Sequence, residues 1–405
     1  MKFIHTSDIH LGAPFVGIRG ESSNELKSKL LSATLDSFSA MVDYAIAEDV
    51  DFILVSGELI DPENKSVLVQ VFLEEQFNRL NKNEINVYVS LNDLDDLENF
   101  KKNNIWSNKV HILSTIDNQV DVNLITTNDN KRIAIVGFSY KNQPYQTNPL
   151  NSFIKRDKEL DYQIGMFYGE PGESNQSFNL NQMIELGYDY WALGSLNNQK
   201  ILNETPFVGY PGTLQGLSKN EPGQKGFLLV SDVNNQLVPE FVPTAPIEWQ
   251  SMVANVTDVS DQKQLINGIV NALQSQNVKS FQILSIELNS SENLSENIAN
   301  QINDGTILQE LNNELLRQFD KFYASNIYLN YTKQTVQLNS LDNRYWEASI
   351  DKIFSQDSVD QKFFGINHNF IIDYFSDMQT IDNIQSRSQT ELLNNQNKAT
   401  VENEL

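Results

Sequence analysis

The sequence predicts an α/β protein built from two parts of unequal size. Residues 2–90 alternate short apolar runs with helical patterns, whereas residues 110–245 carry mostly strand patterns. Strands that alternate with helices along a chain pair in parallel through right-handed crossovers. We therefore expect a large domain over residues 1–245, a small α/β accessory domain over 246–340, and a C-terminal helical segment with a polar tail over 341–405.

Apolar periodicity locates the elements of the first part. Leu31, Leu35 and Phe38 belong to a stripe with three-to-four spacing that predicts a helix over residues 26–48. A second stripe, from Val69 to Leu80, predicts another helix. Short apolar runs predict the strands that flank these helices, at residues 2–7, 51–57 and 85–90.

The helical signals weaken after residue 110. Strands are predicted there at residues 110–113, 133–138, 163–167, 190–193, 207–210 and 226–231. This change suggests a second, more antiparallel half packed against the first, with a boundary bracketed by Pro243 and Pro246. The accessory domain beyond it is predicted to contain strands at 251–256, 281–288 and 327–331 and helices at 261–275 and 306–321.

Composition and charge restrict the functional classes. The chain has 29 Lys and Arg against 53 Asp and Glu, so it carries no strong basic stripe and is expected to contact DNA only weakly or through a partner. It contains no cysteine, which excludes disulfides and thiolate metal sites. Without an apolar run of about 18–20 residues or a signal-like start, it is predicted to be a cytoplasmic protein with no membrane segment.

Polar residues follow several of the predicted strands. Asp8 and His10 come after the first strand, Glu58 after the second and Asn92 after the third. In an extended backbone residues i and i+2 project from the same side, so the side chains of Asp8 and His10 can point at one cation. Later strands end near further polar side chains, namely Tyr168, Ser195 and Asn197.

This pattern resembles that of the calcineurin-like metallophosphoesterases, and among them the SbcD/YhaO type of DNA repair exonuclease. The family pattern runs Asp-x-His, Gly-Asp-x-x-Asp, Gly-Asn-His-Asp/Glu, His-Gly and Gly-His-x-His. The corresponding stretches here are Asp8 to His10, Gly57 to Asp61, Leu91 to Leu94, Tyr168-Gly169 and Gly194 to Asn197. Flanking stretches at 207–216, 220–227 and 243–249 resemble the YhaO type more than SbcD itself. The resemblance covers residues 1–249 and implies a metallophosphoesterase four-layer αββα sandwich.

The departures from the family pattern fall on the residues that carry its chemistry. Such a site needs two divalent metals roughly 3.5–4 Å apart, bridged by a carboxylate. The bridging aspartate is replaced by Glu58, and the catalytic histidine by Asp93, whose negative charge would repel a phosphate. Three histidine ligands become Tyr168, Ser195 and Asn197, which are poor donors for manganese or zinc.

The resemblance therefore implies a reduced metal site and no intact catalytic residue. The remaining ligands would be Asp8, His10, Glu58, Asn92 and Asn197, which hold no metal or at most one weakly bound manganese or magnesium ion. The sequence has four histidines, and the other three are predicted to be packing or surface residues: His5, His111 and His368.

Three functional hypotheses follow. The first is a non-catalytic subunit or scaffold that acts with an SbcC/YhaN-like coiled-coil ATPase, the usual partner in this family. The alternative is a manganese-dependent DNA exonuclease or phosphodiesterase that works with a reduced metal site. The third is a binding module for a nucleotide or phosphoprotein. Asp8, His10, Glu58 and Asn92 could also form only a buried hydrogen-bond network, with a cation or a raised pKa. A homodimer is compatible with each hypothesis.

Overall fold

The computed structural model describes most of the 405 residues. It describes residues 1–18, 23–61, 66–92, 108–113, 120–140, 149–172, 177–256, 259, 261–290 and 295–331, with isolated positions beyond. The chain divides into two compact units, of which the larger contains Met1–Met252, Val270–Ser285 and Ile307–Asn326. The smaller contains Val253–Ile269, Ile286–Thr306 and Ile327–Leu405. The domain boundaries expected near residues 245 and 340 remain predictions, and Asp93 and His368 lie outside the described residues.

The first sheet contains six strands in the order β12-β11-β1-β2-β3-β4. The strands β1 to β4 pair in parallel, as the alternation of strands and helices predicts. The strands β11 and β12 extend the sheet in antiparallel fashion. The bounds are β1 Lys2–Ser7, β2 Phe52–Ser56, β3 Asn86–Ser90, β4 Val110–Ile112, β11 Gly226–Val233 and β12 Gln236–Pro243.

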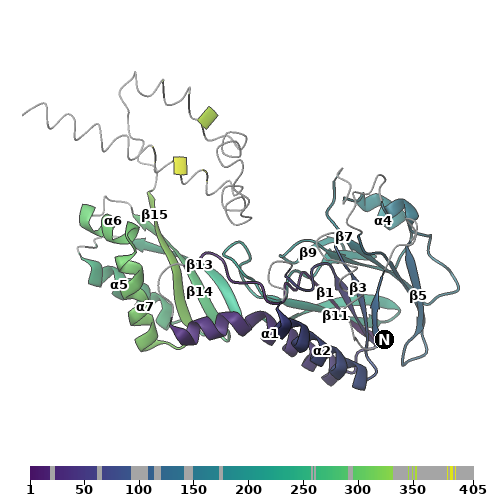
Figure 1. Ribbon diagram of the computed structural model, residues 1–405. Coiled ribbons are helices and arrows are strands. Elements are labelled where there is room, and N and C mark those ends of the chain that lie inside the picture. Colours follow the sequence, from purple (N-terminus) through teal and green to yellow (C-terminus); the bar gives the residue numbers. More distant parts are fainter. Residues whose placement is uncertain are drawn as a thin grey trace, which may run out of the picture. The chain divides into compact units, whose positions relative to one another are not determined.

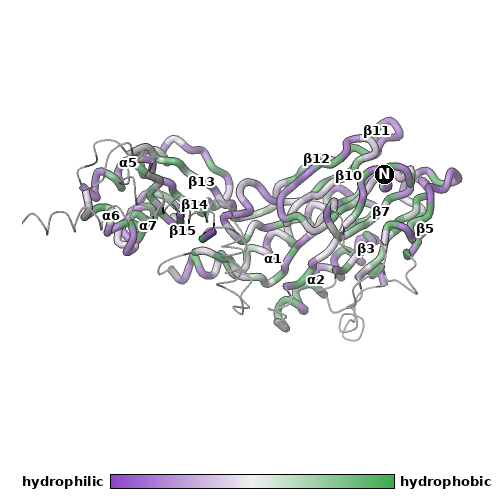
Figure 2. Tube along the Cα trace, turned by 90° about the horizontal axis from the view of Figure 1, so that it is seen from above, coloured by the Kyte–Doolittle hydropathy of each residue, from purple (hydrophilic) through white to green (hydrophobic). Residues whose placement is uncertain are grey.

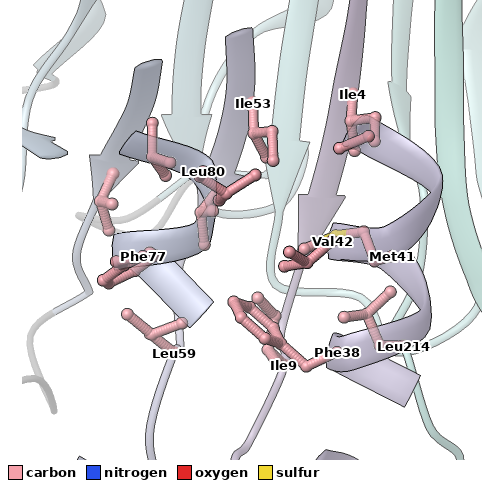
Figure 3. Close-up of a cluster of buried hydrophobic side chains, with 14 of the residues drawn as sticks. Ile4, Ile9, Phe38, Met41, Val42, Ile53, Leu59, Phe77, Leu80 and Leu214 are labelled. Atoms are coloured by element: carbon pink, nitrogen blue, oxygen red, sulfur yellow. The ribbon is translucent and has the colours of Figure 1, made fainter. Parts of the chain in front are cut away.

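Two helices, α1 (Asn24–Ala47) and α2 (Val67–Lys82), cover the outer face of this sheet (Figure 1). A serine caps each one: Ser23 accepts a hydrogen bond from the Leu26 N–H, and Ser66 accepts one from the Val69 N–H. Figure 3 shows apolar side chains of both helices packed against strand residues, among them Phe38, Met41, Val42, Phe77, Leu80, Ile4 and Ile53. Burying one such side chain stabilises the fold by roughly 1.5–3 kcal/mol. In Figure 2 both helices carry hydrophobic and hydrophilic positions, as one buried and one exposed face require.

The second sheet contains six strands in the order β5-β6-β7-β8-β10-β9. Its four inner strands are parallel, and only the edge strands β5 and β9 pair in antiparallel fashion. The expectation of a more antiparallel half was therefore wrong for the centre of this sheet. Among the described residues, its crossovers contain a 3-10 turn (Pro149–Ser152) and the short helix α4 (Leu180–Glu185), which give little helical signal. The bounds are β5 Asp121–Thr126, β6 Arg132–Gly137, β7 Tyr162–Tyr168, β8 Tyr190–Gly194, β9 Lys200–Asn203 and β10 Phe207–Tyr210.

The two sheets face each other across a shared apolar layer. Phe3 of β1 stacks on Phe52 of β2, with ring centroids 4.8 Å apart, and meets the edge of Tyr190 of β8 at 5.3 Å. The opposite face of the second sheet packs on an aromatic cluster that includes Phe153 and Trp191. Helices, two sheets and the short α4 layer together form the predicted four-layer αββα sandwich.

A glycine on β7 makes room for the largest ring of this outer cluster. A Cβ built on Gly165 would lie 2.3 Å from Cε3 of Trp191. The indole of Trp191 also stacks on Tyr188, with ring centroids 4.6 Å apart. Because real Cβ contacts are never this short, the indole can occupy its position only while residue 165 lacks a side chain.

A third sheet follows in the order β13-β14-β15 (Ile247–Val256, Phe281–Ser290 and Phe322–Tyr331). It is accompanied by three helices, α5 (Gln262–Gln274), α6 (Glu296–Asn303) and α7 (Thr306–Gln318), as the sequence predicts except for α6. Within the larger unit, Ile247 and Trp249 of β13 pack with Ala33 of α1. None of the helices in the described ranges has the length and apolarity needed to cross a membrane.

Candidate functional site

The loops that follow β1, β2 and β3 bring four predicted site residues together. The three strands are parallel and in register, so their carboxyl ends meet at one edge of the sheet. Asp8, His10, Glu58 and Asn92 lie in these loops, and Asp8 and Asn92 are fully buried. We call these four residues the polar cluster. Their convergence is the arrangement that the sequence motifs predict.

Glu58 is at the centre of the polar cluster. Its Oε2 lies 2.7 Å from Nδ1 of His10, and its Oε1 accepts a hydrogen bond of 2.7 Å from Nδ2 of Asn92. The backbone supports the same pairing, because the N–H groups of Ile9 and His10 both donate to the Glu58 carbonyl, at 2.7 and 3.1 Å. Both carboxylate oxygens of Glu58 therefore have protein donors.

The pKa values indicate that His10 and Glu58 form an ion pair. Burial works against the charged form of His10, but the hydrogen bond and negative charge of Glu58 outweigh burial and raise the pKa of His10 to about 9. Burial likewise works against the charge on Glu58, but His10, Asn92 and Tyr168 hold its pKa below the ordinary value. The imidazolium of His10 thus supplies a positive charge inside the cluster.

Asp8 is held by groups from both sheets. Its Oδ2 accepts a 3.0 Å hydrogen bond from the backbone N–H of Ser195, and its carbonyl accepts one of 2.5 Å from Oγ1 of Thr213. Burial raises the pKa of Asp8 to about 6, although His10 and the Ser195 N–H favour the charged form. The backbone of Asp8 and His10 is in the left-handed region, with φ of 47° and 49°, which turns the chain sharply after β1.

The second sheet contributes three residues at positions where the resemblance predicts histidines. Tyr168, at the end of β7, hydrogen-bonds to Glu58 through its side chain. Ser195 follows β8 with φ of 119°, and its Oγ donates to Oε1 of Glu170 at 3.2 Å. Asn197 donates from Nδ2 to Oε1 of Glu221 at 3.0 Å. Tyr168 and Ser195 therefore reach the polar cluster, whereas the described side-chain bond of Asn197 goes elsewhere.

Sequence reasoning missed two charged residues close to the site, Glu221 and Lys225. The negative charge of Glu221 contributes to the raised pKa of His10. Lys225 is buried and donates from Nζ to the carbonyl of Asn197 at 3.2 Å. Burial lowers the pKa of Lys225, and Glu221 partly opposes this effect. Both residues belong to the stretch 220–227, whose resemblance to YhaO-type sequences was the only available signal.

Two of the remaining histidines have packing roles, as expected. His5 on β1 is fully buried, with Nδ1 3.0 Å from the Tyr190 hydroxyl and Nε2 3.0 Å from the Leu193 carbonyl. Burial lowers the pKa of His5 to about 3, so its ring is neutral and joins the two sheets. His111 on β4 stacks on Tyr88, with ring centroids 4.8 Å apart.

Comparisons with known proteins agree with this geometry. The family model "Calcineurin-like phosphoesterase" matches residues 1–194, which include the ends of β1, β2, β3, β7 and β8. Over these residues the chain is similar to the calcineurin-like metallophosphoesterases. It is 33% identical over 272 residues to "Uncharacterized metallophosphoesterase YhaO" of Bacillus subtilis (strain 168). That match covers 65% of this chain and 65% of the relative, just under two thirds of its length.

Among solved structures, the chain is similar to a dimetal phosphatase from Danio rerio. The superposition has a TM-score of 0.33 and 7% sequence identity, and it covers 57% of this chain and 92% of that one.

A metallophosphoesterase of this superfamily needs donors for two bridged cations, and the residues here can be tested against that need. Within the described ranges, no three histidine, aspartate or glutamate side chains are grouped so that they could hold a metal ion. The carboxylate of Glu58 is bonded on both oxygens, and Ser195 faces Asp8 with a backbone N–H, which is a hydrogen-bond donor and no metal ligand. These donors do not fit a dinuclear centre in this arrangement.

Proposed function

We propose that this chain is a non-catalytic metallophosphoesterase-like subunit that acts as a scaffold for a coiled-coil ATPase of the SbcC/YhaN type. The observation that supports this proposal best is the ion pair between His10 and Glu58, with Nδ1 and Oε2 2.7 Å apart. A carboxylate that would hold two cations must bind them in competition with the hydrogen-bond donors already on its oxygens. Here the two oxygens of Glu58 accept from His10 and Asn92, and the imidazolium of His10 supplies the positive charge that pairs with the carboxylate.

The charges around the polar cluster also disfavour a phosphodiester substrate. Glu58 is ionised, and Glu221 lies close enough to favour the charged form of His10. A negatively charged phosphate would meet these carboxylates in a partly buried setting, where Coulomb repulsion is stronger than in water. Metals would offset this repulsion in an active metallophosphoesterase.

The partner in this proposal comes from the resemblance to the SbcD/YhaO type. The 33% identity to the YhaO metallophosphoesterase supports that resemblance over 272 residues. A net charge of −24 agrees with a subunit that contacts DNA weakly or through its partner.

Metal analysis is the experiment that tests the loss of the dinuclear site. Purified full-length protein is dialysed against manganese, and bound metal is measured by elemental analysis together with a calorimetric titration. We expect less than about 0.2 manganese per chain after removal of free metal, because the ligands of a preformed site are lacking. Two tightly bound manganese ions per chain would overturn the proposal.

A nuclease assay separates the scaffold from the alternative, a manganese-dependent exonuclease or phosphodiesterase with a reduced site. Linear DNA is incubated with the protein and manganese, beside an Asp8→Ala, His10→Ala double variant. We expect the native chain to hydrolyse no more DNA than the double variant does. Hydrolysis that disappears in that variant would establish the enzyme instead, whereas hydrolysis common to both would identify a contaminating nuclease and leave the scaffold standing.

The partner is tested separately by affinity purification of the tagged full-length chain from its own cells. Recovery of a coiled-coil ATPase in stoichiometric amount is the expected result. If no such ATPase is recovered, the scaffold role with this partner is rejected, while the metal analysis still decides whether the site is catalytic.

A further inference from the structure

One segment contacts both the polar cluster and the first strand of the third sheet. We call residues 212–225 the connector; they lie between β10 and β11 and belong to the larger unit. At one end, Thr213 donates from Oγ1 to the Asp8 carbonyl at 2.5 Å, and its N–H donates to the Asn197 carbonyl at 3.2 Å. The connector is therefore bonded directly to the loops that carry the site.

Two charged side chains of the connector strengthen this attachment. Glu221 accepts from Nδ2 of Asn197 at 3.0 Å and, through its other oxygen, from the N–H of Leu217 at 2.7 Å. Lys225 donates to the Asn197 carbonyl at 3.2 Å and also contacts the side-chain oxygen of Asn198, at 2.5 Å. Since Lys225 is 4% exposed, these bonds form in a setting where an unsatisfied ammonium would be costly.

The other contacts of the connector are to β13. The buried side chain of Gln215 donates to the Ile247 carbonyl at 2.8 Å and accepts from the Ile247 N–H at 3.4 Å. The indole of Trp249 donates to the Gly216 carbonyl at 3.2 Å, and the Gly223 N–H donates to the Trp249 carbonyl at 2.8 Å. These bonds fix the first residues of β13 to the same segment that holds Asp8.

The loop after His10 also contacts both the connector and β13. The N–H of Val16 donates to the Leu217 carbonyl at 2.9 Å. Phe15 stacks on Trp249, with ring centroids 6.4 Å apart and planes inclined by 24°. The site loop and β13 are thus joined twice, once through the connector and once through Phe15.

We propose that the connector is a conformational relay through which the polar cluster and the start of β13 stabilise each other. A change that loosens the Asn197–Glu221 contact loosens β13, and a change at Gln215 or Trp249 loosens the bonds to Asp8. A protein or ligand that binds at either end can then alter order at the other. This relay does not depend on whether the site is catalytic, so its test is independent of the test of the proposed function.

Hydrogen–deuterium exchange of the full-length chain tests the relay in the outward direction. Glu221→Gln keeps the shape of the side chain but replaces one acceptor oxygen by a donor, so one of its two bonds is lost. We expect roughly tenfold faster exchange in peptides that cover 212–225 and also in those that cover 247–252, since local opening free energies set exchange rates. Exchange in β5 and β6 should not change. Faster exchange confined to 197–225, with no change in 247–252, would overturn the relay.

The inward direction uses Gln215→Met, with Gln163→Met as the matched control. Both glutamines are fully buried, but the described bond of Gln163 is accepted from the Asp157 N–H, away from the connector. The relay predicts that Gln215→Met, and not Gln163→Met, accelerates exchange of the Ser195 amide, which donates to Asp8. Equal acceleration by both variants would indicate global destabilisation and contradict the relay. If Gln215→Met does not fold, Trp249→Phe, which removes the bond to Gly216 and part of the buried ring, carries the same comparison.

Discussion

The two sheets of the sandwich contribute differently to the site. Loops of the first sheet supply Asp8, His10, Glu58 and Asn92, and the last three form charged or charge-assisted contacts with one another. Loops of the second sheet supply a tyrosine, a serine and an asparagine, where the resemblance predicts histidines, and these neutral groups donate hydrogen bonds to carboxylates. The ion pair thus lies on the first sheet, whereas the second sheet supplies neutral donors.

The largest expected effect comes from removing the ion pair of the first sheet. Glu58→Ala leaves the half-buried His10 without its partner and should lower the free energy of unfolding by about 3 kcal/mol, measured by urea denaturation. Glu170→Ala, at an exposed carboxylate beside Ser195, should change it by less than about 0.5 kcal/mol. Equal effects of the two variants would show that the sheets do not differ in this way.

Introducing histidines on the second sheet tests the comparison from the other side. The triple variant Tyr168→His, Ser195→His, Asn197→His, alone or with Asp93→His, returns imidazole donors to the site. Manganese at a hundred times its dissociation constant should then stabilise the variant by about 2.7 kcal/mol, as measured by thermal unfolding with and without the metal. The same variant with Asp8→Ala should gain nothing. A triple variant that manganese leaves unaffected would mean that the first-sheet residues can no longer serve as ligands.

The contact between the sheets gives the next effect through His5, whose pKa is lowered to about 3 by burial. The unfolded chain takes up this proton near pH 6.5 while the folded chain does not, so the stability from neutral His5 is complete above pH 6.5. It is lost as pH falls from 6.5 toward 3, by about 2 kcal/mol at pH 5. Urea denaturation at pH 7 and pH 5 should show this loss in the native chain but not in His5→Gln. Parallel losses in both would exclude His5 as the source.

The smallest effect concerns the backbone at Ser195. Its φ of 119° is rarely adopted by a residue with a side chain, so Ser195→Gly should raise the free energy of unfolding by about 0.5–1 kcal/mol. Asn235→Gly is a suitable control, since asparagine tolerates its φ of 63°. If Ser195→Gly is destabilising, the contact between Oγ of Ser195 and Glu170 matters more than the strain.

The parallel strands β1 to β3 of the first sheet and helices α1 and α2 could be predicted from sequence because their signals are local. Long amphipathic helices and fully apolar strands alternate, so both the elements and their parallel pairing followed from periodicity. The strands β5, β9 and β12 were not predicted. The β5 strand alternates half-buried and exposed positions, and β9 has only four residues, so neither carries a clear apolar pattern.

The candidate site was predictable to a similar extent. The convergence of Asp8, His10, Glu58 and Asn92 follows from their places after adjacent parallel strands. The contacts of Thr213 and Glu221 do not follow from the order of the strands in this way. They depend on the pairing of β11 with β1, two strands that are separated in sequence by more than half of the larger unit. Such long-range pairing leaves no local pattern, so these residues emerge only from the three-dimensional arrangement.

The close fit between Gly165 and Trp191 has a consequence for how this sequence can drift. An alanine at position 165 would place its methyl group 2.3 Å from the indole, so the indole or the strand would have to move to accommodate that substitution. A smaller side chain at position 191 would remove this conflict. The residues allowed at the two positions therefore depend on each other.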